Sequence, residues 1–518
     1  MAQGTLKKVF RLLNPFHVSM LTIAMATTRR LLVLSAFVEL GLLPVAKALI
    51  IQPAANSALL EGKRLRGPKS GNRTTSCAPL TNRGTFFTVK VEVGSPSQSF
   101  DVVADTGSDD VIVNSCLCAQ LGHCDAANKC FVGTGRSSSF SVLSTSDGGA
   151  LSLVLSFGSG QIKSVIATDV VRVGHVSTLM KNSLLLMVDR ALTFSGPFEG
   201  ILGLGIPRTD IATDSPPLLF RPWQEFNLSG FRPQGFLEEA AVRRFSMCFN
   251  HDSDGALRLD TPPLQRPLGS VGQFHWGLDF RGMSVGSATA PVAVCDPVSM
   301  GPQQVTACGA IPDSGTTLIM GDAGHLQTLF TTLCTTWPRC QAAAGSFDGH
   351  KYELFQLLLM NCTEWMGETG LSELPPLFFH VAGITGIEQT LEVGPDAYIF
   401  ITRQEEVHYV KKNLLGVFPV RVAVHTGKER TMCVPAFGSM RYNTVKNGPV
   451  WILGTPFFHS YVISYDLSSM PPSISFSNES CGSCERTALL SQGHRTGRRP
   501  REMHGPARMP SIDTSLPL

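Results

Sequence analysis

Residues 100–108 read Phe-Asp-Val-Val-Ala-Asp-Thr-Gly-Ser, and residues 308–316 read Cys-Gly-Ala-Ile-Pro-Asp-Ser-Gly-Thr. In both stretches a short apolar run leads into an Asp-(Thr/Ser)-Gly-(Ser/Thr) tetrad, and the two aspartates, Asp105 and Asp313, are 208 positions apart. Alternating apolar residues over 87–93, a Gly-Ser-Pro turn and renewed alternation up to residue 104 predict a β-hairpin that leads to Asp105. The repetition of this pattern in the second half predicts a duplicated, β-rich lobe.

The two tetrads contain the residue types for acid–base chemistry with a pair of carboxyl groups. Hydrolysis of a peptide bond without a metal ion or a covalent nucleophile needs one group that accepts a proton from water and another that polarises the carbonyl. Two carboxyls that share one proton provide both. The glycines at Gly107 and Gly315 allow tight loops whose N–H groups face the carboxylates. Asp105 and Asp313 are therefore the candidate catalytic residues, with two ordinary Asp-Gly turns as the alternative.

From residue 75 to about residue 480, the chain resembles the pepsin-like family of eukaryotic aspartic endopeptidases. The segment that ends at Ser108 resembles the first active-site loop of that family. Residues 198–205 (Phe-Glu-Gly-Ile-Leu-Gly-Leu-Gly) and 451–454 (Trp-Ile-Leu-Gly) resemble its two ψ-loop strands, and residues 374–379 and 395–399 match core segments of its second lobe. The resemblance implies an all-β, bilobal fold of double-ψ β-barrel-type lobes, with the active-site cleft between the lobes.

The resemblance also implies roles for the two tetrads. Asp105 and Asp313 correspond to a dyad that activates water, hydrolyses protein or peptide substrates and needs no cofactor or metal. The second position of each tetrad corresponds to a hydroxyl that bonds the backbone of the opposite lobe. The fourth position corresponds to a hydroxyl that bonds the outer carboxylate oxygen. The predicted supporting set is Thr106, Gly107, Ser108, Ser314, Gly315 and Thr316.

The hairpin that covers the dyad in this family departs here from the usual pattern. The family usually has Tyr-Gly-x-Gly at the tip of this flap, whereas residues 156–160 read Ser-Phe-Gly-Ser-Gly and place Phe157 and Gly158 there. The Trp that the flap Tyr normally bonds is replaced by Ile112. Because both partners of one hydrogen bond are absent, neither is left unsatisfied, and we expect an apolar contact between Phe157 and Ile112.

Two other functions stay open as hypotheses. The altered flap is compatible with a catalytically weak or inactive protein of the pepsin fold that binds peptides. The cysteine clusters are compatible with a redox or metal protein, either through Cys481-Gly-Ser-Cys484 or through His123 among its neighbouring cysteines. The main hypothesis remains a monomeric aspartic endopeptidase.

The N-terminus predicts entry into the secretory pathway. Arg29 and Arg30 precede an apolar run over 31–45, and Ala-Lys-Ala at 46–48 has the small-x-small pattern of signal-peptide cleavage. We predict a signal peptide over 1–48, with an uncleaved signal anchor as the alternative. The product is then extracellular or held in an acidic, lysosome- or vacuole-like compartment. Four glycosylation sequons fit this pathway: Asn72, Asn227, Asn361 and Asn478.

Charge is unevenly distributed along the chain. Residues 1–73 carry eleven Lys and Arg against two acids, and residues 485–518 carry six against three, which leaves 26 basic and 35 acidic residues for 74–484. An acidic body argues against nucleic acid as a partner. It fits a basic propeptide that covers the body of a zymogen, with a solvated linker as the alternative. The predicted divisions are a propeptide over 49–76, an N-terminal lobe over 77–270, a C-terminal lobe over 271–484 and a disordered basic tail over 485–518.

Fourteen cysteines in an oxidising compartment predict disulfides. By resemblance to the family, Cys362 and Cys433 correspond to the bridge of the second lobe, and Cys248 reaches Cys481 or Cys484 as in the β-secretase pattern. Cys77 then takes the C-terminal cysteine that remains. The other candidates lie in the loop after the first tetrad, on either side of the hairpin before the second, and in one local loop: Cys116, Cys118, Cys124 and Cys130; Cys295 and Cys308; Cys334 and Cys340.

Overall fold

The structure is a computed structural model of the chain. It describes residues 75–157, 160–192, 199–207, 232–367, 370–414, 418–484, 501–503, 508, 512, 514 and 516–518. All of them belong to one compact unit, Ser70–Leu518. The predicted signal peptide or anchor, the propeptide before residue 75 and the flap residue Gly158 lie outside the described residues.

Strands of the first half, joined by two strands from the end of the second, form a 14-stranded sheet. Its order is β12-β24-β23-β10-β11-β1-β2-β3-β9-β4-β8-β7-β5, and β6 pairs with β7. The strands are β1 (Ser76–Asn82), β2 (Phe87–Val93), β3 (Gln98–Asp105), β4 (Val111–Asn114), β5 (Ser141–Val142), β6 (Ser152–Phe157), β7 (Gly160–Val173), β8 (Val176–Leu192), β9 (Gly200–Gly203), β10 (Arg244–Cys248), β11 (Gly255–Leu259), β12 (Leu268–Gly269), β23 (Val462–Asp466) and β24 (Ser473–Ser477).

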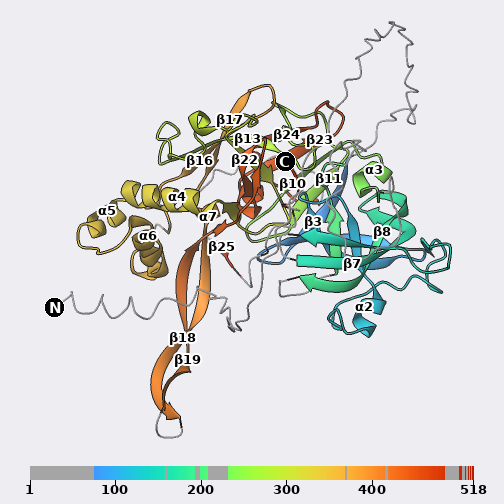
Figure 1. Ribbon diagram of the computed structural model, residues 1–518, viewed down its shortest axis with the longest axis horizontal. Helices are drawn as coiled ribbons and strands as arrows, with labels where there is room; N and C mark the ends of the chain where they lie inside the picture. Colours follow the sequence, from blue (N-terminus) through green and yellow to red (C-terminus); the bar gives the residue numbers. More distant parts are fainter. Residues whose placement is uncertain are drawn as a thin grey trace, which may run out of the picture. The chain divides into compact units, whose positions relative to one another are not determined.

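The remaining described strands form an 8-stranded and a 3-stranded sheet. The larger has the order β17-β16-β13-β14-β22-β15-β20, with β21 paired to β22, and the smaller has the order β19-β18-β25. Figure 1 shows β18 and β19 as a long orange ribbon. The strands are β13 (Leu278–Val285), β14 (Cys308–Pro312), β15 (Ile319–Gly321), β16 (Leu377–Ala382), β17 (Glu388–Val393), β18 (Ile399–Leu414), β19 (Phe418–Pro435), β20 (Phe437–Ser439), β21 (Asn443–Thr444), β22 (Gly448–Leu453) and β25 (Arg501–Glu502).

The same local arrangement of three strands occurs in both halves. Strand β3, which ends at Asp105, runs parallel to β9, and β9 runs antiparallel to β4. Strand β14, which ends at Pro312 directly before Asp313, runs parallel to β22, and β22 runs antiparallel to β15. In each half the central strand therefore lies between the strand that leads to the aspartate and the strand that follows it. These two sheet-rich lobes confirm the predicted all-β, bilobal fold.

The predicted hairpins are present, with one correction. Strand β2 pairs antiparallel with β3, and the alternating Val89, Val91 and Val93 are buried. In the second half β16 pairs with β17. From the sequence alone, the apolar runs 377–381 and 391–400 on either side of a Gly-containing turn predict a hairpin whose second arm reaches Phe400, and this end of the arm is wrong. The arm ends at Val393, because Pro395 lies in the first turn of helix α7 and a new strand begins at Ile399.

A helical segment lies between β15 and β16 in the second half, and the all-β resemblance did not predict it. Helices α4, α5 and α6 pack against one another, and Figure 1 shows them grouped in yellow. The Asp322 side chain caps α4 by accepting from the N–H groups of Gly324 and His325. The described helices are α2 (Cys116–Gln120), α3 (Phe236–Glu239), α4 (Ala323–Thr336), α5 (Pro338–Ala344), α6 (Lys351–Met360), α7 (Pro395–Tyr398) and α8 (Thr455–Ser460), with short 3₁₀ turns at Pro297–Ser299 and Cys362–Glu364.

All fourteen cysteines are joined in seven disulfides. Of the two C-terminal partners left open for Cys248, the structure selects Cys481, and Cys77 bonds Cys484. Because no thiol is left free, the cysteine clusters have neither a redox dithiol nor thiolate ligands for zinc. The other pairs are Cys116–Cys130, Cys118–Cys124, Cys295–Cys308, Cys334–Cys340 and Cys362–Cys433.

Part of the predicted disordered tail has a defined position. Arg501 and Glu502 form β25, which pairs in parallel with Phe400 and Ile401 of β18. Arg508, Ile512 and Leu518 are buried. At these described residues the structure differs from the prediction of disorder, because each makes contacts with residues far away in the sequence.

We predict that the disulfide between the two ends of the body stabilises the fold more than a local one. Removing Cys77–Cys484 in a Cys77→Ser/Cys484→Ser variant frees a long loop, even though Cys248–Cys481 already closes part of it. The chain-entropy model then gives a loss of about 5 kcal/mol in the free energy of unfolding, against about 2 kcal/mol for the six-residue loop of Cys334–Cys340. Denaturant unfolding of both double variants measures the difference, and equal losses would contradict the loop-size explanation.

Candidate active site

The two aspartates lie at the ends of equivalent strands and are held by equivalent hydrogen bonds. The N–H of Gly107 donates to Asp105 Oδ1 at 2.9 Å, and the N–H of Gly315 donates to Asp313 Oδ1 at 2.8 Å. On the outer oxygens, Ser108 Oγ donates to Asp105 Oδ2 at 2.5 Å, and Thr316 Oγ1 donates to Asp313 Oδ2. Each carboxyl group therefore has its orientation fixed at both oxygens by its own loop.

The second residue of each tetrad connects the two loops. Thr106 Oγ1 donates to the carbonyl of Pro312 at 2.9 Å and accepts from the N–H of Ser314 at 3.0 Å. Ser314 Oγ donates to the carbonyl of Ala104 at 2.8 Å and accepts from the N–H of Thr106 at 3.0 Å. These four crossed hydrogen bonds are buried, so they hold the backbones of the two loops at a fixed separation.

The two carboxyl groups affect each other's ionisation. Asp105 and Asp313 have no exposed surface. Burial raises the pKa of Asp313 well above its ordinary 3.8, and the negative charge of Asp105 and a hydrogen bond with it act in the same direction. The hydroxyl of Thr316 and the N–H of Gly315 oppose this rise in the pKa. The geometry therefore favours a pair that keeps one proton, held by Asp313, after an ordinary carboxyl would have lost it.

Glycines next to the dyad allow a close approach of the backbones. A Cβ on Gly107 would lie 2.8 Å from Asp313 Oδ1, across the boundary between the two loops. A Cβ on Gly454, directly after β22, would lie 2.2 Å from the carbonyl oxygen of Leu318. A side chain at either position would push apart the strands that position the carboxyl groups.

Several residues that support the site were not predicted. Thr317 Oγ1 donates to the carbonyl of Thr85 at 2.8 Å, which adds another bond between the halves. The buried hydroxyl of Tyr465 donates to the carbonyl of Pro312 at 3.4 Å, and burial raises the pKa of this tyrosine. Thr455 Oγ1 donates to the carbonyl of Thr317 at 2.8 Å. Thr317 adjoins the second tetrad, which is the one signal that could have indicated its role.

The flap residues that the structure describes lie in an apolar environment. Phe157 ends β6 and pairs with Gly160 at the start of β7. Ile112 is fully buried in a cluster with Ile162 and Met187, and Phe157 packs against this cluster. The expected association of Phe157 with the surroundings of Ile112 is thus compatible with the structure, while their part in substrate binding stays a prediction.

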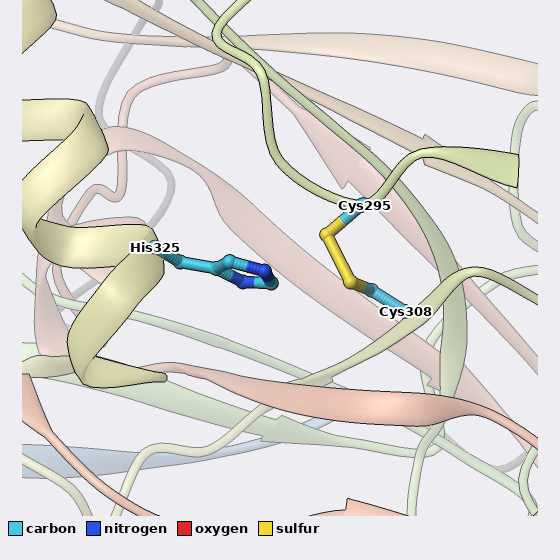
Figure 2. A group of neighbouring side chains, drawn as sticks. All are labelled: Cys295, Cys308 and His325. Atoms are coloured by element: carbon cyan, nitrogen blue, oxygen red, sulfur yellow. A yellow bond between two sulfur atoms is a disulfide. The ribbon is translucent and has the colours of Figure 1, made fainter. Parts of the chain in front are cut away.

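One cluster of metal-ligand residue types comes together among the described residues, away from the dyad. It consists of Cys295, Cys308 and His325, whose ligand atoms lie within 4.8 Å of one another. Figure 2 shows that the two sulfurs are joined to each other and that the ring of His325 points toward them. The sulfurs are therefore not available as thiolates. His325 stacks on Trp451 instead, and burial lowers its pKa.

The comparison with known protein families decides the classification. Residues 86–478, which include both tetrads, match the family described as eukaryotic aspartyl protease. The chain belongs to this family.

Within the part that the structure describes, no helix is both long and apolar enough to cross a membrane.

Individual relatives are distant but cover most of the chain. Renin of Canis lupus familiaris is 23% identical over 406 residues, which span 77% of this chain and 80% of the renin. Renin of Rattus norvegicus is 24% identical over 408 residues, with coverage of 77% and 81%. Pepsin II-2/3 of Oryctolagus cuniculus is 23% identical over 381 residues, with coverage of 73% and 77%. These proteins support a peptidase at the level of the family.

The raised pKa of Asp313 predicts a pH-dependent effect of its replacement. A carboxyl whose pKa is higher in the folded than in the unfolded protein contributes most to stability below the unfolded pKa, and this contribution falls as the pH rises through the folded pKa. Because asparagine does not ionise, Asp313→Asn removes this loss of stability at higher pH. We expect the variant to have a higher melting temperature than the parent at pH 7, with a gain that shrinks as the pH approaches about 4.

Thermal unfolding at a series of pH values measures this effect. The control is Asp348→Asn, which removes one negative charge from an exposed position. A gain for Asp313→Asn that is constant or grows toward low pH would contradict the direction of the pKa shift.

Proposed function

We propose that this member of the aspartyl protease family is an active aspartic endopeptidase whose dyad is Asp105 and Asp313. The observation that carries the proposal is the symmetric pair of loops, in which each buried carboxyl is oriented at both oxygens and Thr106 and Ser314 cross-link the loops. This pre-organisation supports the proposal, because two buried acids held in fixed orientations can act together on one water molecule. A structural pair of turns has no need for this arrangement.

The reaction uses the two carboxyl groups in different protonation states. Asp105, ionised, accepts a proton from a water molecule as the water oxygen attacks the scissile carbonyl carbon. Asp313, whose pKa is raised, donates its proton to the carbonyl oxygen, and a neutral tetrahedral diol forms. Transfer of the proton from Asp105 to the amide nitrogen then allows the C–N bond to break. As the diol collapses to a carboxylic acid, one of its hydroxyl groups returns a proton to Asp313, which restores the initial protonation of the pair.

The substrates are proteins or peptides that bind in an extended conformation. Backbone groups near the dyad suit main-chain pairing with such a segment, and pockets then select side chains. The apolar flap around Phe157 favours an apolar environment near the scissile bond. The altered flap also favours a second candidate, a weakly active or inactive peptide-binding protein with the same fold.

The proposal includes a secreted or endomembrane zymogen. Seven disulfides require an oxidising compartment during folding. The basic residues before position 74 and the acidic body provide charges that attract at neutral pH and weaken as body carboxylates protonate. Acidification would then release the propeptide and start activity.

Replacement of one aspartate tests the endopeptidase activity. We expect acidified full-length protein to cleave a mixed peptide library and a statine-type inhibitor to block the cleavage. Asp105→Asn keeps an oxygen that accepts from Gly107 but removes the base, so its rate should fall at least about 10²–10⁴-fold. Asp348→Asn, with an exposed side chain, is the matched control and should retain the parental rate.

Two outcomes would oppose this proposal. Cleavage by the purified protein that persists unchanged in Asp105→Asn would show that Asp105 is not the base of the reaction. Equal inactivity of folded parent and variant from about pH 3 to pH 7, also after removal of the N-terminal and C-terminal segments, would favour the peptide-binding alternative.

A further inference from the structure

The C-terminal end of the chain lies at the candidate active site. Beyond β25, the N–H of Met503 donates to the carbonyl of Ile401 at 2.8 Å. At the other end, the N–H of Gln273 donates to the carbonyl of Leu518 at 2.9 Å, and the hydroxyl of Tyr442 donates to the carbonyl of Leu516 at 2.9 Å. The described residues of 501–518 are thus attached to the body on both sides of Arg508 and Ile512.

Arg508 pairs through its backbone with the residue that follows the second tetrad. Its N–H donates to Thr317 Oγ1 at 2.6 Å, and its carbonyl accepts from the N–H of Thr317 at 3.1 Å. Thr317 Oγ1 in turn donates to Thr85. One of the two bonds between Arg508 and Thr317 therefore joins backbone to backbone, and the other joins the tail backbone to the Thr317 hydroxyl. Both use polar groups of the residue directly after the second tetrad, as an extended peptide ligand would.

The side chain of Arg508 is buried close to the two acids. It is 8% exposed, and its guanidinium lies over the ring of Phe86, 4.7 Å from the ring centroid. Burial lowers the pKa of Arg508 to about 10, while Asp105 and Asp313 oppose this fall by attraction. At this pKa the group is still charged at neutral and acidic pH. Its positive charge therefore compensates the negative charge of the dyad.

Ile512 lies beside the carboxyl group of Asp313. A Cβ on Gly107 would be 2.9 Å from Asp313 Cγ and 2.9 Å from Ile512 Cγ1, so both side chains border the same small space. Ile512 has no exposed surface and shares an apolar cluster with Ile311, Ile452 and Leu518. A substrate residue could not occupy this space while Ile512 remains there.

We propose that the C-terminal tail, through its described residues Arg508 and Ile512, is an intramolecular ligand of the active site, which blocks substrate until it is displaced. This inference rests on the proposed function, since a cleft that binds extended peptides is what the tail would fill. The tail has the chemistry of such a ligand: a backbone that pairs with Thr317, a cation opposite two acids, and a branched apolar side chain beside Asp313.

Attachment to the same chain makes a modest affinity sufficient. A ligand that is covalently tethered to its target acts at an effective concentration on the order of 1 mM. A segment that binds with a Kd of about 10 µM as a free peptide would then be bound about 99% of the time. The expected consequence is a suppression of turnover of about 100-fold, which is lost when the connection is cut and the products are diluted.

The test uses the full chain, folded whole, with a recognition site for a sequence-specific protease inserted between residues 487 and 497. We expect turnover of a peptide substrate to rise by up to about 100-fold after cutting and dilution, and excess synthetic peptide 501–518 to reverse the rise. The uncut Arg508→Ala/Ile512→Ser variant should already have the higher rate. Asp348→Asn, which changes an exposed residue outside the tail, should behave like the parent.

A binding measurement separates this inference from the proposed function. Labelled peptide 501–518 is added to the cut protein, and a statine-type inhibitor is added as competitor. Binding that the inhibitor displaces supports the inference even if no form of the protein cleaves any peptide, in which case the endopeptidase proposal alone fails. Absence of binding, or binding that the inhibitor does not displace, would overturn it, and so would equal, measurable rates before and after cutting of a protein that cleaves peptides.

Discussion

The crossed hydrogen bonds between Thr106 and Ser314 are the constraint on which the rest of the site depends. Two carboxyl groups without exposed surface repel each other when both are ionised, and an unsupported pair would move apart or admit water. The four crossed bonds fix the loop backbones instead, and Ser108 and Thr316 fix the outer oxygens. Burial, together with the negative charge of Asp105 held nearby, then raises the pKa of Asp313, which is useful for proton transfer.

The parts of the site that follow from local sequence could be predicted. In each tetrad the hydrogen bonds to the aspartate come from residues two and three positions later, so the pattern of residues defines the geometry. The alternation before Asp105 predicted β2 and β3 for the same reason. The partner of Cys248 could not be chosen from sequence, because Cys481 and Cys484 are only three positions apart. Only the folded chain brings Cys248 beside Cys481 and Cys77 beside Cys484.

Other features depend on contacts that no local pattern records. The pairing of Arg508 with Thr317 joins residues 191 positions apart, and the bond from Thr317 to Thr85 joins residues 232 positions apart. Composition predicted disorder for the tail, because the contacts with the body that bury its described residues leave no pattern in the tail's own sequence. Helix α4 was missed for a different reason. Its capping residue Asp322 and its apolar spacing at Leu326, Leu329 and Leu333 were present, but the all-β fold implied by the resemblance outweighed them.

The central claim is that Asp105 and Asp313 share one proton and act as one catalytic unit. The most direct measurement is the pH dependence of kcat/KM for the uncut Arg508→Ala/Ile512→Ser variant. We predict a bell-shaped profile at acidic pH whose two limbs belong to the pair, with activity lost at every pH when Asp313 is replaced by Asn. A single rise near pH 6.5, as for an ordinary histidine, with activity retained in that replacement, would contradict it.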